Sequence, residues 1–418
     1  MPPSPQLSQY LLIKRHYLCI DVPCQWPTTN DTHIVIIMEE NYKFNEIRPF
    51  RDNEVEKAIE GLCNVPYFLN VLAKLFPGVP VDGVVAKLKA MRSVSEFQHQ
   101  FIIPYLNGLV KKCTDSLTAS GLEGLDPRGG YLFMSNHRDI ILDSAFMNVK
   151  LDEAGFTTTE IAIGSNLLIY EWIEDLVKLN KSFVVKRGMP VRQQMDASST
   201  LSAYVRDRIV NGRQNIWIAQ REGRSKDGDD KTQGSVLKML NLSGTADLVA
   251  NFKELNIVPV AITYEYDPCD ALKAYQFQQK RDDANYKKSE NEDLTHMATG
   301  LNGRKGHVHF AFGKPINNAL DALSGRPKNE QIAAIAEMID SQIYANYKLW
   351  PVNYIALDAE EGTNKRTAHY TEAEKTNFMA YLDTKIDQIG DKADRPYLRS
   401  QILKAYANPL INQEKALS

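Results

Sequence analysis

The stretch that decides the fold spans residues 131–144 and ends in Ser135-Asn136-His137-Arg138-Asp139-Ile140-Ile141-Leu142-Asp143-Ser144. A short apolar strand is predicted over Tyr131–Ser135, and an amphipathic helix is predicted over Asp143–Glu153. A polar segment between a strand and a helix is the place where open α/β sheets bind ligands. The segment therefore predicts an α/β sheet with a site at the carboxyl end of this strand.

The same alternation of short apolar strands and amphipathic helices continues along the chain. Further strands are predicted at Glu160–Gly164, Ser182–Lys186, Asn215–Gln220, Ile257–Tyr264 and His307–Gly313. Helices are predicted between them at Tyr170–Leu179, Val191–Val210, Ser235–Phe252 and Cys269–Thr295. Strands that are apolar throughout are covered on both faces. We predict an α/β fold with a mostly parallel or mixed central sheet, helices on both faces, and helical N- and C-terminal extensions.

Composition and spacing divide the chain into four predicted parts. Residues 1–37 are rich in Pro and form a poorly ordered extension, with Met38 as the hypothetical natural start. Residues 38–125 form a helical N-terminal region, since Asp52–Gly121 has apolar residues at helical spacing. Residues 126–350 form the α/β domain, and residues 351–418 form a helical C-terminal tail.

Bulk properties exclude several classes of protein. The net charge of −3 argues against nucleic acid as the main partner, since phosphate binding normally needs a basic surface. No apolar run approaches the ~18 residues of a spanning helix. The five cysteines are scattered without metal-ligand spacing, which favours reduced thiols in a cytoplasmic protein and no metal site.

His137 lies beside two carboxylates, Asp139 and Asp143. A His with an orienting carboxylate can take a proton from a hydroxyl as general base. The alternative is a capped helix start, with Asp139 as the N-cap. His-Arg-Asp also occurs in protein-kinase catalytic loops, but a kinase needs Asn where this chain has Ser144, so that class is excluded.

Three later segments also lie at predicted strand ends. Lys186-Arg187 ends one strand, and Arg221-Glu222-Gly223-Arg224-Ser225 follows another. Their cations and hydroxyl suit a phosphate, and Gly223 permits close backbone approach, although solvated surface charges are the alternative for each segment. The next strand contains Pro259, which indicates an edge or strand-start position. All these segments converge on one edge of the predicted sheet.

From about Leu132 to Pro315 the residues resemble the glycerol-3-phosphate and lysophosphatidic acid acyltransferase superfamily. The resemblance rests on four blocks in the family's order. Asn136-His137-Arg138 with a following Asp is similar to the first block, and Gly164-Ser165-Asn166-Leu167 with Phe183–Arg187 to the second. Arg221–Ser225 with Lys231 and Gly234 resembles the third block, Val258-Pro259-Val260 the fourth, and His307–Pro315 the terminal strand.

Two departures from the family pattern stand out. The family's first block has Asp five residues after His, but that position is Leu142 here. Asp143 can serve as partner only if the turn after His137 absorbs one extra residue; we favour Asp143, with Asp139 as the rival. The family's third block is Glu-Gly-x-Arg-Ser, with two residues between Glu and Arg. Here only Gly223 lies between Glu222 and Arg224, so Arg221 stands at the family's Glu position when the Arg-Ser pairs are aligned.

The resemblance implies transfer of a fatty acyl group from acyl-CoA or acyl-carrier protein to the hydroxyl of a glycerol-3-phosphate or lysophosphatidate-type acceptor. His137 would be the base and Asp143 its partner, with no metal and no cofactor beyond the thioester. The residues implied in acceptor phosphate binding are Lys186, Arg187, Glu222, Gly223, Arg224 and Ser225. A cytoplasmic protein, peripheral at the inner face of the membrane, follows from this substrate class. Candidate membrane contacts are Tyr67, Phe68, Leu69, Val71 and Leu72, with ordinary core as their alternative.

Other functions on the same fold stay open. The acceptor could be another lysolipid or an acylated amino acid. A non-catalytic lipid-binding protein and a thioester hydrolase are the remaining alternatives. His307 and His309 share one strand face, and we interpret them as structural because no third ligand accompanies them.

Overall fold

The computed structural model of the protein describes residues 44–289 and 291–418. The chain divides into two units, Met1–Asn45 and Glu46–Ser418, and everything below concerns the second. The predicted extension over residues 1–37 and the hypothetical start at Met38 lie outside the described residues. Cys63, Cys113 and Cys269 are buried free thiols, and none of the described cysteines forms a disulfide.

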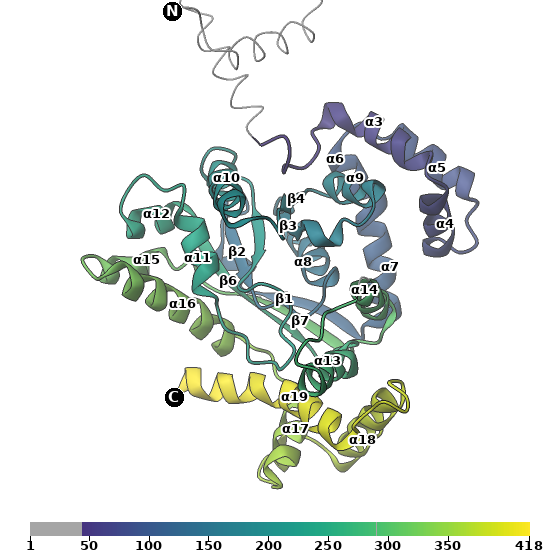
Figure 1. The fold of residues 1–418 in the computed structure, drawn as a ribbon, viewed down its shortest axis with the longest axis vertical. Coiled ribbons are helices and arrows are strands. Elements are labelled where there is room, and N and C mark those ends of the chain that lie inside the picture. Colours follow the sequence, from purple (N-terminus) through teal and green to yellow (C-terminus); the bar gives the residue numbers. More distant parts are fainter. Residues whose placement is uncertain (1–43, 290) are drawn as a thin grey trace, which may run out of the picture. The chain divides into compact units, whose positions relative to one another are not determined.

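A seven-stranded mixed sheet forms the centre of this unit (Figure 1). In sheet order, β6, β2, β5, β3 and β4 are parallel, whereas β7 is antiparallel to β6 and parallel to the edge strand β1. The strands are β1 (Ser116–Ser120), β2 (Leu132–Ser135), β3 (Glu160–Gly164), β4 (Ser182–Val185), β5 (Ile216–Ala219), β6 (Ile257–Tyr264) and β7 (His307–Phe312). The predicted α/β fold with a mixed sheet is confirmed, and each predicted strand lies within one residue of its predicted ends.

Strand β1 was not predicted, because we expected helices throughout Asp52–Gly121. Its residues are half-buried and alternate between polar and apolar, which is typical of an edge strand. Side chains fix its pairing with β7: Ser116 Oγ lies 2.9 Å from His307 Nδ1, and Thr118 Oγ1 lies 2.8 Å from His309 Nδ1. The sheet therefore begins before residue 126, where we placed the start of the α/β domain.

The expected edge position of Pro259 is wrong, since β6 lies between β7 and β2. Gly313 N donates a hydrogen bond to Pro259 O at 2.8 Å, just beyond the end of β7. In a strand the N and O of one residue point to the same side. The missing N–H of Pro259 therefore faces Gly313, just past the end of β7, so the one bond that proline removes lies at the end of the ladder.

Helices cover both faces of the sheet. On one face, α7 (Ile103–Cys113) and α8 (Leu142–Glu153) share a core with Val258, Val260 and Ile262 of β6. The alternate residues of β6 face the other way, where α16 packs on β6 and α10 on β5. The helices of this second face are α10 (Val191–Val210), α11 (Gly234–Asn241), α12 (Leu248–Glu254), α15 (Asn317–Leu320) and α16 (Lys328–Ala345).

Two predicted long helices are each divided in two. The segment 235–252 breaks between α11 and α12, where a Cβ on Gly244 would lie 2.1 Å from the Asn251 side chain. Asn251 Nδ2 donates to Asn241 Oδ1 and to Ala246 O, both at 3.0 Å, and this fixes the turn. The segment 269–295 likewise divides into α13 (Asp270–Asp282) and α14 (Glu292–Asn302).

The N-terminal helices form a separate small core against α9 (Glu171–Leu179). They are α3 (Asp52–Cys63), α4 (Pro66–Leu75), α5 (Val81–Ala90) and α6 (Val94–Phe97), followed by a π-helical turn over Gln98–Ile102. Phe68 and Leu72, predicted as membrane contacts, are each 1% exposed in this core, so that prediction is wrong for them. Their side chains face α3 and α5 because the apolar positions of α4 repeat at helical spacing.

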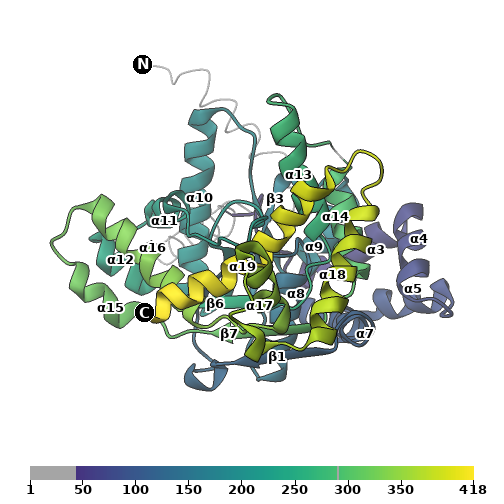
Figure 2. The ribbon, with the colours of Figure 1, turned by 90° about the horizontal axis from the view of Figure 1, so that it is seen from below.

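Three helices close the chain: α17 (Pro351–Glu361), α18 (Glu372–Asp387) and α19 (Arg395–Leu417). They share their own apolar core, which includes Phe378, Leu398 and Tyr406. Figure 2 shows α19 as a long diagonal helix, and it packs on α13, α16 and α17. None of the described helices is both long and apolar enough to cross a membrane.

Candidate functional site

His137 follows β2 at the carboxyl edge of the parallel strands and forms a pair with Asp143. The distance from His137 Nδ1 to Asp143 Oδ2 is 2.7 Å. The Asp143 side chain is fully buried, while that of His137 remains 14% exposed. A buried carboxylate on one ring nitrogen leaves the imidazole fixed in orientation and open on its other side.

The turn after His137 brings Asp143 to the ring although the spacing is six residues. Asp143 Oδ2 also accepts hydrogen bonds from Arg138 N at 2.6 Å and Asp139 N at 3.0 Å. The helix does not begin until Leu142, so the extra residue is absorbed in irregular backbone. The carboxylate therefore holds both the imidazole and the start of the turn.

Asp139, the alternative partner for His137, contacts the backbone of the turn and not the imidazole. Its Oδ1 accepts from Ile141 N at 2.9 Å and from Leu142 N at 2.8 Å, and these bonds fix the turn that leads into α8. Burial, and then the charge of Asp143, raise the pKa of Asp139. Helix α14 packs closely on it, since a Cβ on Gly300 would lie 2.1 Å from Asp139 Oδ2.

Two aromatic residues that we did not predict complete the surroundings of the pair. Tyr264 OH, at the end of β6, donates to Asp143 Oδ1 at 3.0 Å. Burial and the charge of Asp143 raise the pKa of Tyr264 well above its ordinary value, so the hydroxyl keeps its proton. The Trp217 ring meets His137 edge-on, with centroids 5.6 Å apart at 74°. A Tyr as the last residue of a strand on this edge was the signal available in the sequence.

A buried charge network supports the turn from behind. Arg138 forms an ion pair with Asp230 at 2.7 Å, and Tyr347 OH donates to the same carboxylate at 2.7 Å. Lys273, only 2% exposed, donates to Arg138 O at 2.8 Å and forms an ion pair with Asp267. Side chains from three distant segments thus fix the residue that follows His137.

The third block lies directly against this turn. Ser225 N donates to His137 O at 3.0 Å, and Gly223 adopts the positive φ of 71° that the loop requires. Arg224 does not point to the same place, because its guanidinium donates to His296 Nδ1 on α14 at 3.0 Å. The Ser225 side chain is buried, and its Oγ accepts from Gly228 N at 3.2 Å.

The second block meets the third through an ion pair between Arg187 and Glu222. Ser165 Oγ accepts from Arg187 N at 3.0 Å, which places both halves of the second block together. Lys186 forms an ion pair with Glu46 instead. Among the predicted cations, Arg187 therefore lies next to the third-block loop, whereas Lys186 and Arg224 contact other elements.

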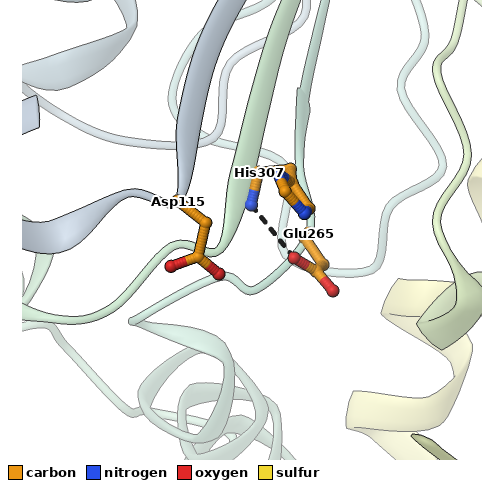
Figure 3. Close-up of side chains that lie close together, drawn as sticks. All are labelled: Asp115, Glu265 and His307. Atoms are coloured by element: carbon orange, nitrogen blue, oxygen red, sulfur yellow. Dashed lines mark hydrogen bonds between the residues drawn. The ribbon is translucent and has the colours of Figure 1, made fainter.

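One group of side chains has a composition that could hold a metal ion. The ligand atoms of Asp115, Glu265 and His307 lie within 4.8 Å of one another (Figure 3). Each acid already has a partner: Glu265 accepts from His307 N at 3.0 Å, and Asp115 forms an ion pair with Arg304 at 2.9 Å. These contacts explain why the three side chains lie together: they connect the ends of β1, β6 and β7.

Comparisons with known proteins found a family model and a solved structure that are similar to this chain. Residues 116–263 match the family model described as Acyltransferase, which begins at β1 and ends in β6. A similar solved structure is the 1-acyl-sn-glycerophosphate (LPA) acyltransferase PlsC from Thermotoga maritima, at 13% identity and a TM-score of 0.33. That match covers 68% of this chain and 91% of that chain. No curated protein matches the chain in sequence.

The matched region is therefore similar to acyltransferase domains. The match covers about a third of the chain, and it includes the segments that resemble the family's four blocks.

We expect Asp143→Asn to lower kcat for acyl transfer by about 10²–10⁴-fold. The amide can present its NH₂ group to Nδ1 and so favour the wrong imidazole tautomer. Steady-state kinetics of the purified variant would measure the loss. Asp139→Asn is the matched control, because it changes a side chain that binds the turn backbone and should act mainly on thermal stability. Equal losses of kcat in both variants would contradict the pairing.

The Arg224–His296 contact predicts a dependence of stability on pH. Burial, and then the charges of Arg224, Lys273 and Lys288, lower the pKa of His296 to about 3, against the opposing charge of Asp293. A lowered folded-state pKa means that this stability is present above the unfolded value of about 6.5 and is lost as pH falls toward 3. The wild type loses unfolding free energy when the pH falls from 7.5 to 5. The His296→Gln variant should lose about 1–2 kcal/mol less over the same range. Denaturant titrations at both pH values would test it, and parallel losses in the two proteins would disprove it.

Proposed function

We propose that this enzyme transfers a fatty acyl group from acyl-CoA or acyl-carrier protein to the hydroxyl of a glycerol-3-phosphate or lysophosphatidate-type acceptor, with His137 as general base. The observation that carries the proposal is the 2.7 Å contact between His137 Nδ1 and the buried Asp143. Among the described residues, no hydrogen bond reaches His137 Nε2. That nitrogen is therefore the one that can accept the proton of an acceptor hydroxyl.

In the proposed reaction, Asp143 keeps the proton of the imidazole on Nδ1 and leaves the lone pair on Nε2. The acceptor hydroxyl gives its proton to Nε2 while its oxygen attacks the thioester carbonyl, so that a C–O bond forms. When the tetrahedral intermediate collapses, the C–S bond breaks, and the imidazolium returns the proton to the departing thiol. Hydrogen bonds from Arg138 N, Asp139 N and Tyr264 orient the carboxylate throughout.

The acceptor phosphate is proposed to bind at Arg187. This cation follows β4 on the same edge of the sheet as His137, and Glu222 holds its guanidinium beside the third-block loop. Arg presents donors in a fork that matches a phosphate. Gly223 lets the loop backbone approach the ligand, with Lys186, Arg224 and Ser225 as the further candidates from the sequence.

The acylated product is a lipid, as is a lysophosphatidate-type acceptor, and we propose that the protein lies on the cytoplasmic face of the membrane as a peripheral protein. Tyr67 and Tyr170 are 62% and 54% exposed, and Ile169 beside them is 44% exposed. The two Tyr rings and Trp172 form one aromatic cluster, with centroids 5.7–6.4 Å apart. Tyr and Trp rings, apolar with one polar end, suit the boundary between lipid and water.

Purified protein would be incubated with labelled palmitoyl-CoA and glycerol-3-phosphate, lysophosphatidate, other lysolipids or water alone. We expect labelled phospholipid with one acceptor, and a rate about 10²–10⁴-fold lower for His137→Ala. Because the general base is removed without a change at Arg187, the acceptor KM should change little.

Each other outcome of this assay has a distinct meaning. Release of CoA without an acceptor would identify a thioester hydrolase. Binding of acyl chains without any transfer would identify a lipid-binding protein. Transfer by His137→Ala at the wild-type rate would overturn the role of His137.

For the membrane, we expect the double variant Tyr67→Ser/Tyr170→Ser to bind phospholipid vesicles about tenfold more weakly, because two exposed rings no longer insert. Vesicle co-sedimentation would measure the change. The control is Val191→Ser/Met195→Ser on α10, where the two side chains are 89% and 60% exposed outside the aromatic cluster. A larger effect from the control pair would place the lipid contact on α10 instead.

A further inference from the structure

A small cavity lies behind the His137 turn, between the α/β domain and the C-terminal helices. Its walls come from the third-block loop, the end of β6, the start of α13, the segment before α17, and α19. Residues that line it include Ser225, Lys226, Lys273, Lys348, Trp350 and Tyr406. Its volume of about 40 Å³ has room for a small polar group, and it is too small for an acyl chain.

Hydrogen bonds fix the walls. Asn408 Nδ2 on α19 donates to Asp227 O in the loop at 2.7 Å. Gly228 has a φ of 73°, and a Cβ there would lie 2.2 Å from Ala405 O, so the loop passes directly against α19. Asn353 Nδ2 donates to Tyr406 O at 2.8 Å and ties α17 to the same helix. The cavity is therefore formed by segments that hold one another in place.

Most charges around the cavity are compensated within the protein. Lys273 pairs with Asp267, Arg138 pairs with Asp230 at 2.7 Å, and Asp270 lies 3.9 Å from Lys385. Tyr381 and Tyr406 also donate to Asp270, at 2.7 and 2.9 Å. These contacts leave no acid in the lining without a partner.

Two cations and one N–H group of the lining lack such a partner. No carboxylate of the described residues lies within ion-pair distance of Lys226 or Lys348. Burial, and then the charges of Lys280, Lys288 and Arg224, lower the pKa of Lys226 to about 8. Trp350 Nε1 is buried and has no acceptor among the described residues. A buried donor without an acceptor is costly, which applies to the Trp350 N–H. Lys226 is half-buried and Lys348 is exposed at the rim, so an anion in the cavity would satisfy the N–H and pair with both cations.

We propose that this cavity binds one phosphate-class oxyanion, held by Lys226, Lys348 and the Trp350 N–H. Lys226 contributes a half-buried charge. Lys348 stands over the Trp350 ring at 4.9 Å from its centroid, which orients its ammonium beside the indole. The anion is either free phosphate or one phosphate of a larger ligand, such as CoA, whose remainder lies outside the cavity.

This site is separate from the edge where the acceptor is proposed to bind, and it does not depend on the proposed acyl transfer. It is nevertheless one contact away from His137. Arg138 and Tyr264 line the cavity, and the Arg138 N–H and Tyr264 hydroxyl both bind Asp143. An anion in the cavity therefore stabilises Arg138 and Tyr264, the two lining residues that bind Asp143.

The test measures the thermal midpoint of the full chain as sodium phosphate or CoA is added, with sodium chloride at equal ionic strength as the reference. We expect a saturable rise in Tm, since a ligand that binds only the folded state stabilises it. Lys226→Met and Lys348→Met should each weaken the apparent affinity by about tenfold or more. A saturable response to phosphate alone would show that the ion itself is the ligand; a response to CoA alone would assign the phosphate to CoA.

Three controls keep the result specific. Lys404→Met removes an exposed charge on α19 outside the cavity lining and should bind as wild type does. Lys226→Arg keeps the charge and should retain most of the affinity, so a folding defect in the Met variant would be recognised. Arg187→Met tests the acceptor edge. The proposal is overturned if no saturable response occurs, or if Arg187→Met abolishes the response and Lys226→Met does not.

Discussion

The structure around the site depends on one buried carboxylate. Asp143 has no exposed side-chain surface, and a charge in such a position is tolerated only when hydrogen bonds replace its water. The donors are the His137 ring, two backbone N–H groups of the turn and the Tyr264 hydroxyl. They come from β2, the turn and β6, so the burial of this one charge ties the imidazole to two neighbouring strands. The same bonds that stabilise the carboxylate fix the geometry that general-base chemistry needs.

Much of that geometry is supported from outside the region that matches the family model. Lys273 and Tyr347 lie beyond residue 263, yet one donates to Arg138 O and the other to the partner of Arg138, Asp230. Tyr406 of α19 accepts a hydrogen bond from Asp267 N, and Asp267 in turn pairs with Lys273. The C-terminal helices therefore belong to the support of the His137 turn. Removing one member of such a network leaves a buried charge without its partner, which is far more destabilising than the loss of a surface contact.

The sequence was sufficient for the fold and for the centre of the site, but not for its supports. The strand β6 was predicted with its observed ends, because burial on both faces makes it apolar along most of its length. The edge strand β1 lacks that signal, and the break at Gly244 depends on a side chain seven residues away. His137 and Asp143 could be found from their resemblance to a known block, although their spacing is one residue longer than in that block. Lys273, Asp230 and Tyr347 could not, since only the tertiary structure brings together side chains about 90–210 positions from His137.

The two departures from the family pattern also have physical consequences at the acceptor edge. The longer turn after His137 is held by Asp139, which binds the backbone at the start of α8, while Asp143 reaches the ring. The altered third block places Glu222 on Arg187, so the cation best placed for a phosphate already carries an acid. Both side chains are about a third or more exposed, and such a pair is worth only about 0–1 kcal/mol. A phosphate with two charge-assisted hydrogen bonds to the guanidinium binds more strongly than that. If the acceptor phosphate binds at Arg187 as proposed, Glu222 can hold the guanidinium in place before the phosphate arrives and still give way to it.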